Sequence, residues 1–218
     1  MTALSASARA LRGGFVVMDA EGKAALRTIP FQFNPELLTR TVTPRGAASG
    51  GGDGLEAARL TGPAAESWSF EIELDALHAP QVPGGPVLAP GQEGVAADLA
   101  ALETLLSPAV ADIEAGIEQA RLGALEILPA PSPLAILVLG PGRVMPVRIT
   151  AMTVTEEAFD IALSPIRATA ALSVEVLTTE DLPWGSGPAG LYLAALARRE
   201  KRAGTRARGL SAVGLTSI

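Results

Sequence analysis

The chain has no cysteine, one histidine and few aromatic residues, and these absences exclude several kinds of chemistry. Without cysteine there is no disulfide framework, no thiolate nucleophile and no cysteine-ligated metal site, which is compatible with folding in the cytoplasm. The single histidine, His78, stands next to a proline-rich stretch, where a lone histidine is more often a surface residue than a catalyst. Aromatic residues make up 4% of the chain and are not interleaved with basic residues, so stacking on nucleic acid is not expected.

Long apolar runs are also absent, although 48% of the 218 residues are hydrophobic and the mean hydropathy is +0.33. No run of about 18 uninterrupted apolar residues occurs, so no membrane span is expected. Residues 1–12 have neither a basic segment nor a long apolar segment, and we therefore expect no signal peptide. A chain of this length can bury one substantial core, with room for an ordered appendage.

The net charge of −6 is distributed unevenly along the chain. The segment after residue 197 has six basic residues against Glu200, a net of +5, which leaves −11 for residues 1–197. An acidic body argues against nucleic acid as a partner, whereas the basic tail can dock on an acidic neighbour. The basic residues are Arg198, Arg199, Lys201, Arg202, Arg206 and Arg208.

The first part of the chain predicts a hairpin that ends in a sharp bend. Residues 13–20 and 24–33 are expected to form two strands around a tight turn at 21–23. Alternation predicts that Phe31 and Phe33 share one face. Asn34-Pro35 then stops the strand, because proline has no N–H to donate. A further strand is expected over residues 37–43.

The remaining pattern predicts a mainly β protein with a helical insertion. Residues 67–75 alternate apolar and acidic side chains, as in a strand with one buried face. A Pro/Gly-rich loop and helices are expected at about 79–128, where helical spacing appears before and after Pro108. Further strands are expected at 134–139, 144–156, 158–163 and 166–178. About seven or eight strands with one helical interruption predict a β-sandwich or barrel with a flanking helix.

We expect one β domain over residues 1–180, followed over 181–218 by a linker, a short helix at 191–202 and a basic tail. The glycine-rich stretch at 44–54 is expected to be a surface loop. That stretch is only a weak phosphate-binding signal, because no buried parallel strand and fitted helix surround it.

No catalytic motif stands out. The chain has no G-x-S-x-G elbow, no H-E-x-x-H sequence and no Walker sequence. The acidic row of the strand at 67–75 is typical of a solvated strand face, since a metal or carboxylate site needs convergence from several elements. We therefore expect no enzymatic activity, no cofactor and no metal.

Two motifs resemble the tube-type subunits of phage-tail-like contractile injection systems. The sequence FQFNPEL at 31–37 is similar to a corner near the start of these subunits, in the group whose longer members carry a LysM module. The sequence FDIALSPIRATAAL at 159–172 resembles the strand pair near the end of tail-tube domains. The order of elements also matches over about residues 13–178. We expect no LysM module, so glycan binding is not carried over, and residues 79–94 and 108–123 look like additions.

The resemblance implies a tail-tube-like β-barrel or sandwich that acts as a tube initiator or hub adaptor. Copies would form a hexameric ring between a trimeric spike protein, other baseplate components and the inner tube protein. The chain would be made in the cytoplasm and assembled into the particle. The implied structural or interface residues are Phe31, Phe33, Asn34 and Pro35 at the corner, Phe159, Pro165 and Arg167 at the last strand pair, and Arg198, Arg199 and Arg202 in the tail.

Two alternatives stay open at this point. One is a stand-alone β-sandwich module that binds a carbohydrate or a protein. The other is a hydrolase that uses carboxylates from the set Glu71, Glu73, Asp75, Glu156 and Glu157.

Overall fold

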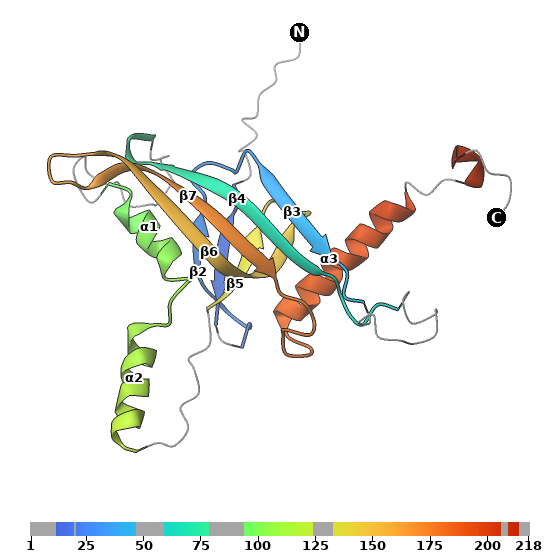
Figure 1. The fold of residues 1–218 in the computed structure, drawn as a ribbon, viewed down its shortest axis with the longest axis horizontal. Helices are drawn as coiled ribbons and strands as arrows, with labels where there is room; N and C mark the ends of the chain where they lie inside the picture. Colours follow the sequence, from blue (N-terminus) through green and yellow to red (C-terminus); the bar gives the residue numbers. More distant parts are fainter. Residues whose placement is uncertain are drawn as a thin grey trace, which may run out of the picture.

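The structure is a computed structural model that describes residues 12–19, 21–46, 59–78, 94–123, 133–205 and 209–213. Most of the two predicted surface loops, at 47–54 and 79–93, lies outside the described residues. The elements in chain order are β1 (Gly14–Met18), β2 (Ala25–Pro30), β3 (Leu38–Thr43), β4 (Ala65–Asp75), η2 (Ala76–His78), α1 (Ala96–Glu103), α2 (Val110–Arg121), β5 (Leu134–Val138), β6 (Val144–Phe159), β7 (Pro165–Val176), α3 (Gly187–Gly204) and η3 (Leu210–Val213) (Figure 1).

The strands form one seven-stranded antiparallel sheet in the order β2-β1-β5-β6-β7-β4-β3. Helices α1 and α2 lie between β4 and β5 in the sequence, which confirms the predicted mainly β fold with a helical insertion. β6 joins two halves of the sheet. β5 pairs only with Val144–Val147 of β6, whereas β7 pairs with β6 from Val147 to Phe159. The register shifts between Ile149 and Ala151, a bulge that bends β6 where it leaves β5.

The two halves pack on each other through a cluster of aromatic rings. The ring centroid of Phe31 lies 5.4 Å from that of Phe15 on β1 and 5.8 Å from that of Phe70 on β4. Alternate residues of β4 and β7 are buried on the same side, as the period-two pattern predicts. This arrangement is a sandwich made by folding one sheet over, with the core between its halves.

Helix α1 flanks the sandwich and adds Val95, Leu99, Leu102 and Leu105 to the core. At its start, the Val95 amide donates to the Pro165 carbonyl at a distance of 2.9 Å. Beyond its end, the Thr104 hydroxyl accepts a hydrogen bond from the Arg27 guanidinium on β2. The helix therefore reaches from the β6–β7 hairpin to the edge strand β2.

The predicted barrel is not supported, because the sheet does not close. β2 and β3 stand at the two ends of the strand order, and the described residues contain no pairing between them. β3 is exposed along almost its whole length. The predicted sandwich with a flanking helix is confirmed, and the sheet has free edges.

The corner differs from the prediction in which side chains it buries. β2 ends at Pro30, Phe31 is buried, and Phe33 is 41% exposed, so Phe31 and Phe33 do not share a face. Amide side chains fix the bend instead. The Gln32 amide exchanges hydrogen bonds of 2.6 and 2.7 Å with the backbone of Asp75, and Asn34 Oδ1 accepts from the Gly13 amide at 2.7 Å.

The last hairpin also differs from the prediction of a separate strand at 158–163. β6 continues without a break to Phe159, and the turn occupies residues 160–164. Asp160 Oδ1 accepts hydrogen bonds from the backbone amides of Ala162 and Ser164, each at 2.8 Å. A single carboxylate thus fixes the turn, which the Ser164-Pro165 pattern did not locate.

Helix α3 is longer than the predicted 191–202. The Ser186 hydroxyl accepts from the Ala189 amide at 3.3 Å, and a proline stands in the first turn. Tyr192 and Ala195 are buried in the same core cluster as the strands. The division of the chain near residue 180 stays a prediction.

Glycine at position 94 is required by a backbone contact, which gives a test of how α1 is anchored. Gly94 has φ +54°, and a Cβ there would lie 2.0 Å from the Pro165 carbonyl oxygen. Gly123 has φ +81° but nothing within 4 Å. We expect Gly94→Ala to lower the free energy of unfolding by more than about 2 kcal/mol, and Gly123→Ala by about 1 kcal/mol, the cost of the left-handed backbone alone. Equilibrium urea unfolding of both variants measures this. Equal losses would mean that the close approach is unimportant.

Candidate assembly surface

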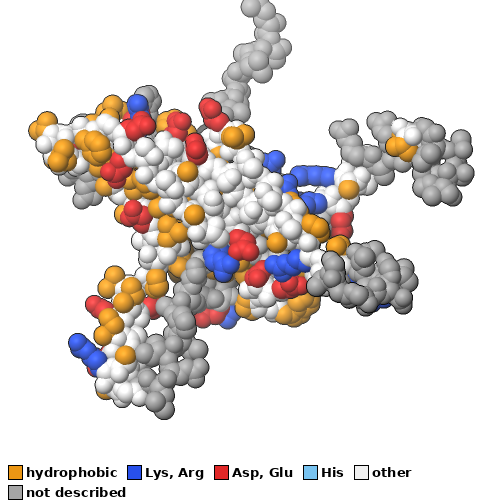
Figure 2. Space-filling model, viewed as in Figure 1, with side chains coloured by type: hydrophobic (Ala, Val, Ile, Leu, Met, Phe, Trp, Pro, Cys, Tyr) orange, Lys and Arg blue, Asp and Glu red, His pale blue; other side chains and the backbone are white. Residues whose placement is uncertain are grey.

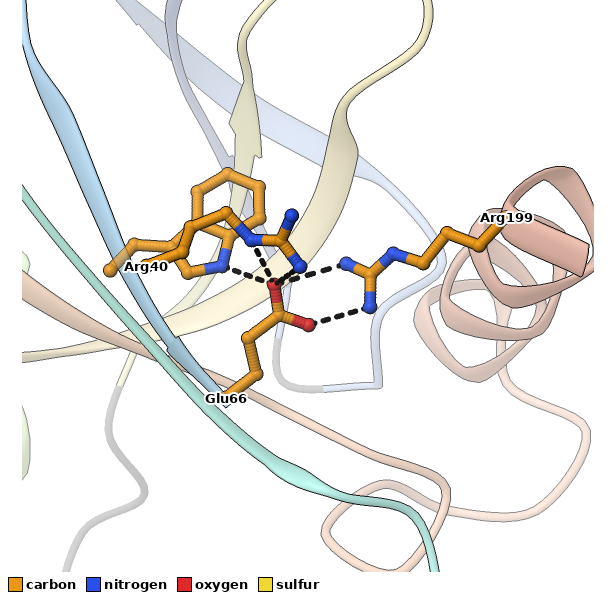
Figure 3. A network of polar contacts seen from close by, with 4 residues as sticks. Arg40, Glu66 and Arg199 are labelled. Atoms are coloured by element: carbon orange, nitrogen blue, oxygen red, sulfur yellow. Dashed lines mark hydrogen bonds and ion pairs between the residues drawn. The ribbon is translucent and has the colours of Figure 1, made fainter. Parts of the chain in front are cut away.

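A buried carboxylate holds β3, β4 and α3 together. Glu66, on β4, is 3% exposed. Its Oε1 accepts hydrogen bonds from Trp68 Nε1 at 2.5 Å and from Arg40 Nε at 2.8 Å. Arg199 of α3 binds both oxygens, with Nη1 2.7 Å from Oε2 and Nη2 3.0 Å from Oε1 (Figure 3). Arg40 Nη2 also lies 2.7 Å from Oε1, so five nitrogen atoms from three elements converge on one side chain.

The arginines keep Glu66 ionised. Burial raises the pKa of Glu66, but hydrogen bonds from Arg199 and Trp68 and the charges of Arg199 and Arg40 outweigh it. The pKa therefore lies below its ordinary value of 4.5. The Arg40 guanidinium also lies 5.6 Å from the centroid of the Trp68 ring, so the same cation contacts an aromatic face.

The three arginines predicted in the basic tail do not form one cluster. Arg199 forms an ion pair with Glu66 of the same chain, and Arg198 is half-buried. Arg202 is exposed, and its guanidinium lies close to Gly142. Exposed Lys201 precedes it, so a basic end of α3 faces away from the core. The residues Arg206 and Arg208 lie outside the described residues.

The residues predicted at the last strand pair lie at or near the tip of the β6–β7 hairpin. Phe159 is 49% exposed and pairs in register with buried Pro165. In the turn, Ile161 is fully exposed and Leu163 is 79% exposed. Arg167 stands further along β7 and forms an ion pair with Asp75, whose Oδ2 lies 3.1 Å from its Nη2. The hairpin thus presents apolar side chains at its tip above an ion pair that joins β7 to β4.

The corner residues border a hollow on the face of the sheet opposite the core. The hollow has a volume of about 590 Å³ and lies between residues 33–37 and strands β4, β6 and β7. Phe33, Asn34 and Glu36 line one side, and Glu71 and Glu73 line the floor. Pro35 is half-buried next to Asn34 and borders a smaller hollow of about 230 Å³. The corner therefore shapes an acidic concave surface.

The five carboxylates considered for hydrolysis are not brought together in this hollow. Glu71 and Glu73 line it, whereas Asp75 is 8% exposed and paired with Arg167. Glu156 and Glu157 lie on β6 opposite Ala168 and Arg167 and do not line it. Within the described residues, no group of three or more His, Cys, Asp or Glu could hold a metal ion. The helices of that part of the chain include none long and apolar enough to cross a membrane.

Within the described residues, four stretches of strand have a neighbouring strand on one side only. β2 pairs only with β1, and β3 only with β4. Residues 71–75 of β4 pair only with β7, because β3 reaches no further than Phe70. The fourth is residues 150–159 of β6, which pair only with β7, because β5 pairs only with the first residues of β6. In the order β6-β7-β4-β3, the free part of β6 and the free edge of β3 lie at opposite sides of one half of the sandwich. Each such edge has backbone groups open to another strand.

Sequence reasoning missed Glu66 and Gln32. The predicted strand began at residue 67. If its alternation is extended by one residue toward the N-terminus, Glu66 falls on the buried face with Trp68 and Phe70. An acid on a buried face needs a cationic partner, which is the signal that could have found it. No comparable signal marks Gln32, because its partner is a backbone group 43 residues away.

No family of proteins and no curated protein sequence matches the chain. Among solved structures, the chain is similar to a chain in the tail of an empty GTA (gene transfer agent) particle with C6 symmetry, with 12% identity. The alignment covers 75% of this chain and 90% of that chain, with a TM-score of 0.28. At this TM-score the likeness gives no evidence of a shared fold or function.

Replacing Glu66 tests whether the buried carboxylate holds α3 in place. Glu66→Gln leaves Arg199 and Arg40 without a counter-charge. Loss of a buried pair costs about 3–5 kcal/mol, and partial exposure of both arginines reduces this to about 1–3 kcal/mol. A depressed pKa in the folded state adds stability above the ordinary pKa of 4.5, and this is lost as pH falls through the folded value. The difference between wild type and variant should therefore be full at neutral pH and shrink below pH 4.5.

The matched control for this measurement is Glu175→Gln, which breaks an ion pair with Arg148 of the same 2.7 Å length between exposed side chains. We expect it to cost less than about 1 kcal/mol. Urea unfolding at several pH values measures both variants. Equal losses, or a Glu66→Gln loss that persists in acid, would contradict the role assigned to Glu66.

Proposed function

We propose that the chain is a structural subunit that assembles edge to edge with copies of itself in a phage-tail-like particle. The observation that carries the proposal is the pair of free edges at opposite sides of the β6-β7-β4-β3 half. When β3 of one copy pairs with residues 150–159 of the next, backbone groups on both edges gain partners. The motif resemblance at 31–37 and 159–172 supports the same role.

Pairing of two different edges is a head-to-tail contact, which closes into a ring when the rotation between copies is suitable. In the proposal this ring is hexameric and acts as a tube initiator or hub adaptor. It lies between a trimeric spike with other baseplate components and the inner tube protein. The subunit has no catalytic role in this proposal. It is made in the cytoplasm and then built into the particle.

The apolar hairpin tip supports contacts between layers of the particle. Ile161 is fully exposed and Leu163 is 79% exposed, and Asp160 fixes the turn that presents them. Two exposed apolar side chains on a rigid turn suit insertion between subunits of an adjacent layer. We assign this contact to the inner tube protein or the spike.

One observation favours the alternative of a stand-alone binding module. The hollow of about 590 Å³ combines the half-exposed ring of Phe33 with polar groups such as Ser69 and Ser173. An aromatic ring beside hydroxyl and carboxylate groups can hold a sugar. On this alternative the chain stays a monomer and binds its ligand alone.

Charges placed on the free edges test assembly. Lysine on an edge strand blocks pairing with another strand. We expect Thr41→Lys on β3 and Thr155→Lys on β6 each to weaken self-association at least tenfold, measured by sedimentation velocity over a range of concentrations. Thr28→Lys on β2 is the matched control, since this edge has no role in the proposed contact. All three side chains are exposed, so folding should be unaffected.

If the wild-type chain remains a monomer at all concentrations, the proposal is wrong and the stand-alone binding module becomes the favoured function. Equal effects of the three lysine substitutions would show that the contact does not use the β3 and β6 edges.

A further inference from the structure

We infer that helix α2 of one copy packs against the outward face of helix α3 of the next copy. The inference deepens the proposed function and rests on it, because it requires copies of the chain to meet head to tail. It assigns a role to the helical stretch at 108–123, which the motif resemblance does not account for.

Helix α2 has an apolar stripe that nothing in the described structure covers. None of its residues is buried. Val110, Ile113 and Ile117 follow helical spacing along one side and are 70%, 48% and 53% exposed. Figure 1 shows α2 projecting from the body of the protein, and Figure 2 shows hydrophobic side chains along it. An amphipathic helix of this length depends on a partner for its apolar side, since isolated helices of about 12 residues are marginal in water.

The stripe is bordered by acidic Glu114 at its middle and by basic Arg121 at the end of the helix. Glu114 lies four residues after Val110 and three before Ile117, so it lies beside the stripe on the helix surface. Asp112 and Gln119 fall on the opposite side of α2. The helix as a whole has a net charge of −2. The partner surface should therefore be apolar along its centre and basic at its border.

The outward face of α3 meets this description. Tyr192 and Ala195 face the core, and Arg199 is bound to Glu66, which fixes the rotation of the helix about its axis. That rotation leaves the stripe Gly190, Leu193, Ala194 and Ala197 exposed, with exposed Lys201 one turn further on and exposed Glu200 on the other flank. Small side chains in this stripe allow another helix to approach closely. The helix has a net charge of +3, opposite in sign to α2.

An antiparallel arrangement brings the matching parts of the two helices together. With Ile117 set opposite Ala197, Glu114 lies close to Lys201, three to four residues away along each helix. α2 is about 18 Å long and α3 about 27 Å, so the stripe of α2 fits within the length of α3. Glu114 of one helix then meets Lys201 of the other, and this pair carries the charge complementarity of the contact.

The two helices lie at different ends of the same molecule (Figure 1). The contact is therefore made between copies, with the α2 end of one copy meeting the α3 end of the next. This is the same head-to-tail sense as the proposed pairing of β3 with β6. Sheet pairing and helix packing then hold adjacent copies at two separate places.

Cysteine cross-linking tests the contact, because the natural chain has no cysteine. A chain carrying Ile117→Cys is mixed with a second, tagged chain carrying Ala197→Cys, and mild oxidation is followed on a non-reducing gel. We expect a disulfide-linked heterodimer in this mixture at least tenfold faster than with Gln119→Cys, the control on the far side of α2. All three positions are exposed, so the substitutions should not disturb folding.

A charge exchange provides the second measurement. Glu114→Lys and Lys201→Glu should each weaken self-association about three- to tenfold by sedimentation, and the double variant should recover most of the loss. Asp112→Lys, on the opposite side of α2, should have no effect.

Chains that self-associate but cross-link equally through positions 117 and 119, or show no recovery in the double variant, overturn the helix contact and leave the proposed function intact. Chains that do not self-associate overturn both.

Discussion

An antiparallel sheet that stays open leaves unpaired backbone groups at its edges, and β6 decides where these edges lie. It is long enough to serve both halves of the sandwich, but β5 covers only its first four residues. The bulge after Ile149 bends β6 away from β5, and among the described residues 150–159 pair only with β7. One half of the sheet is thereby open at both sides, at β6 and at β3. Because these two edges differ, the proposed contact is head to tail and can be repeated by rotation.

The carboxylate of Glu66 fixes the second part of the proposed contact. Its hydrogen bonds to Arg199 hold α3 on the sheet in one orientation, with the basic end and the small-residue stripe outward. Its bond to Arg40 fixes the edge strand β3 from the same point. One buried side chain therefore positions both the edge strand β3 and helix α3, which we infer contacts the neighbouring copy. Disturbing it should affect assembly as well as folding.

Much of the fold could be predicted from local patterns, because burial repeats with a period of two in strands and about four in helices. Trp68, Phe70, Ile72 and Leu74 of β4 are buried, and so are the even-numbered residues of β7 from Ala168 to Val176, as the alternation predicts. The helix pair and the first hairpin were also predictable. Long-range features were not. The sequence pattern does not show that the sheet stays open. It also does not predict that Gln32 pairs with the backbone of Asp75. Phe33 was misplaced because side-chain hydrogen bonds, and not strand alternation, shape the bend.

Imaging the protein in its native assembly tests the central claim most directly. The chain is tagged in its own host, recovered gently from a lysate that contains rod-shaped particles, and examined by negative-stain electron microscopy with a label on the tag. The proposed role predicts label at one end of sheathed rods or on isolated baseplates. Lone small particles, with unlabelled rods present in the same lysate, would contradict a structural role in the particle.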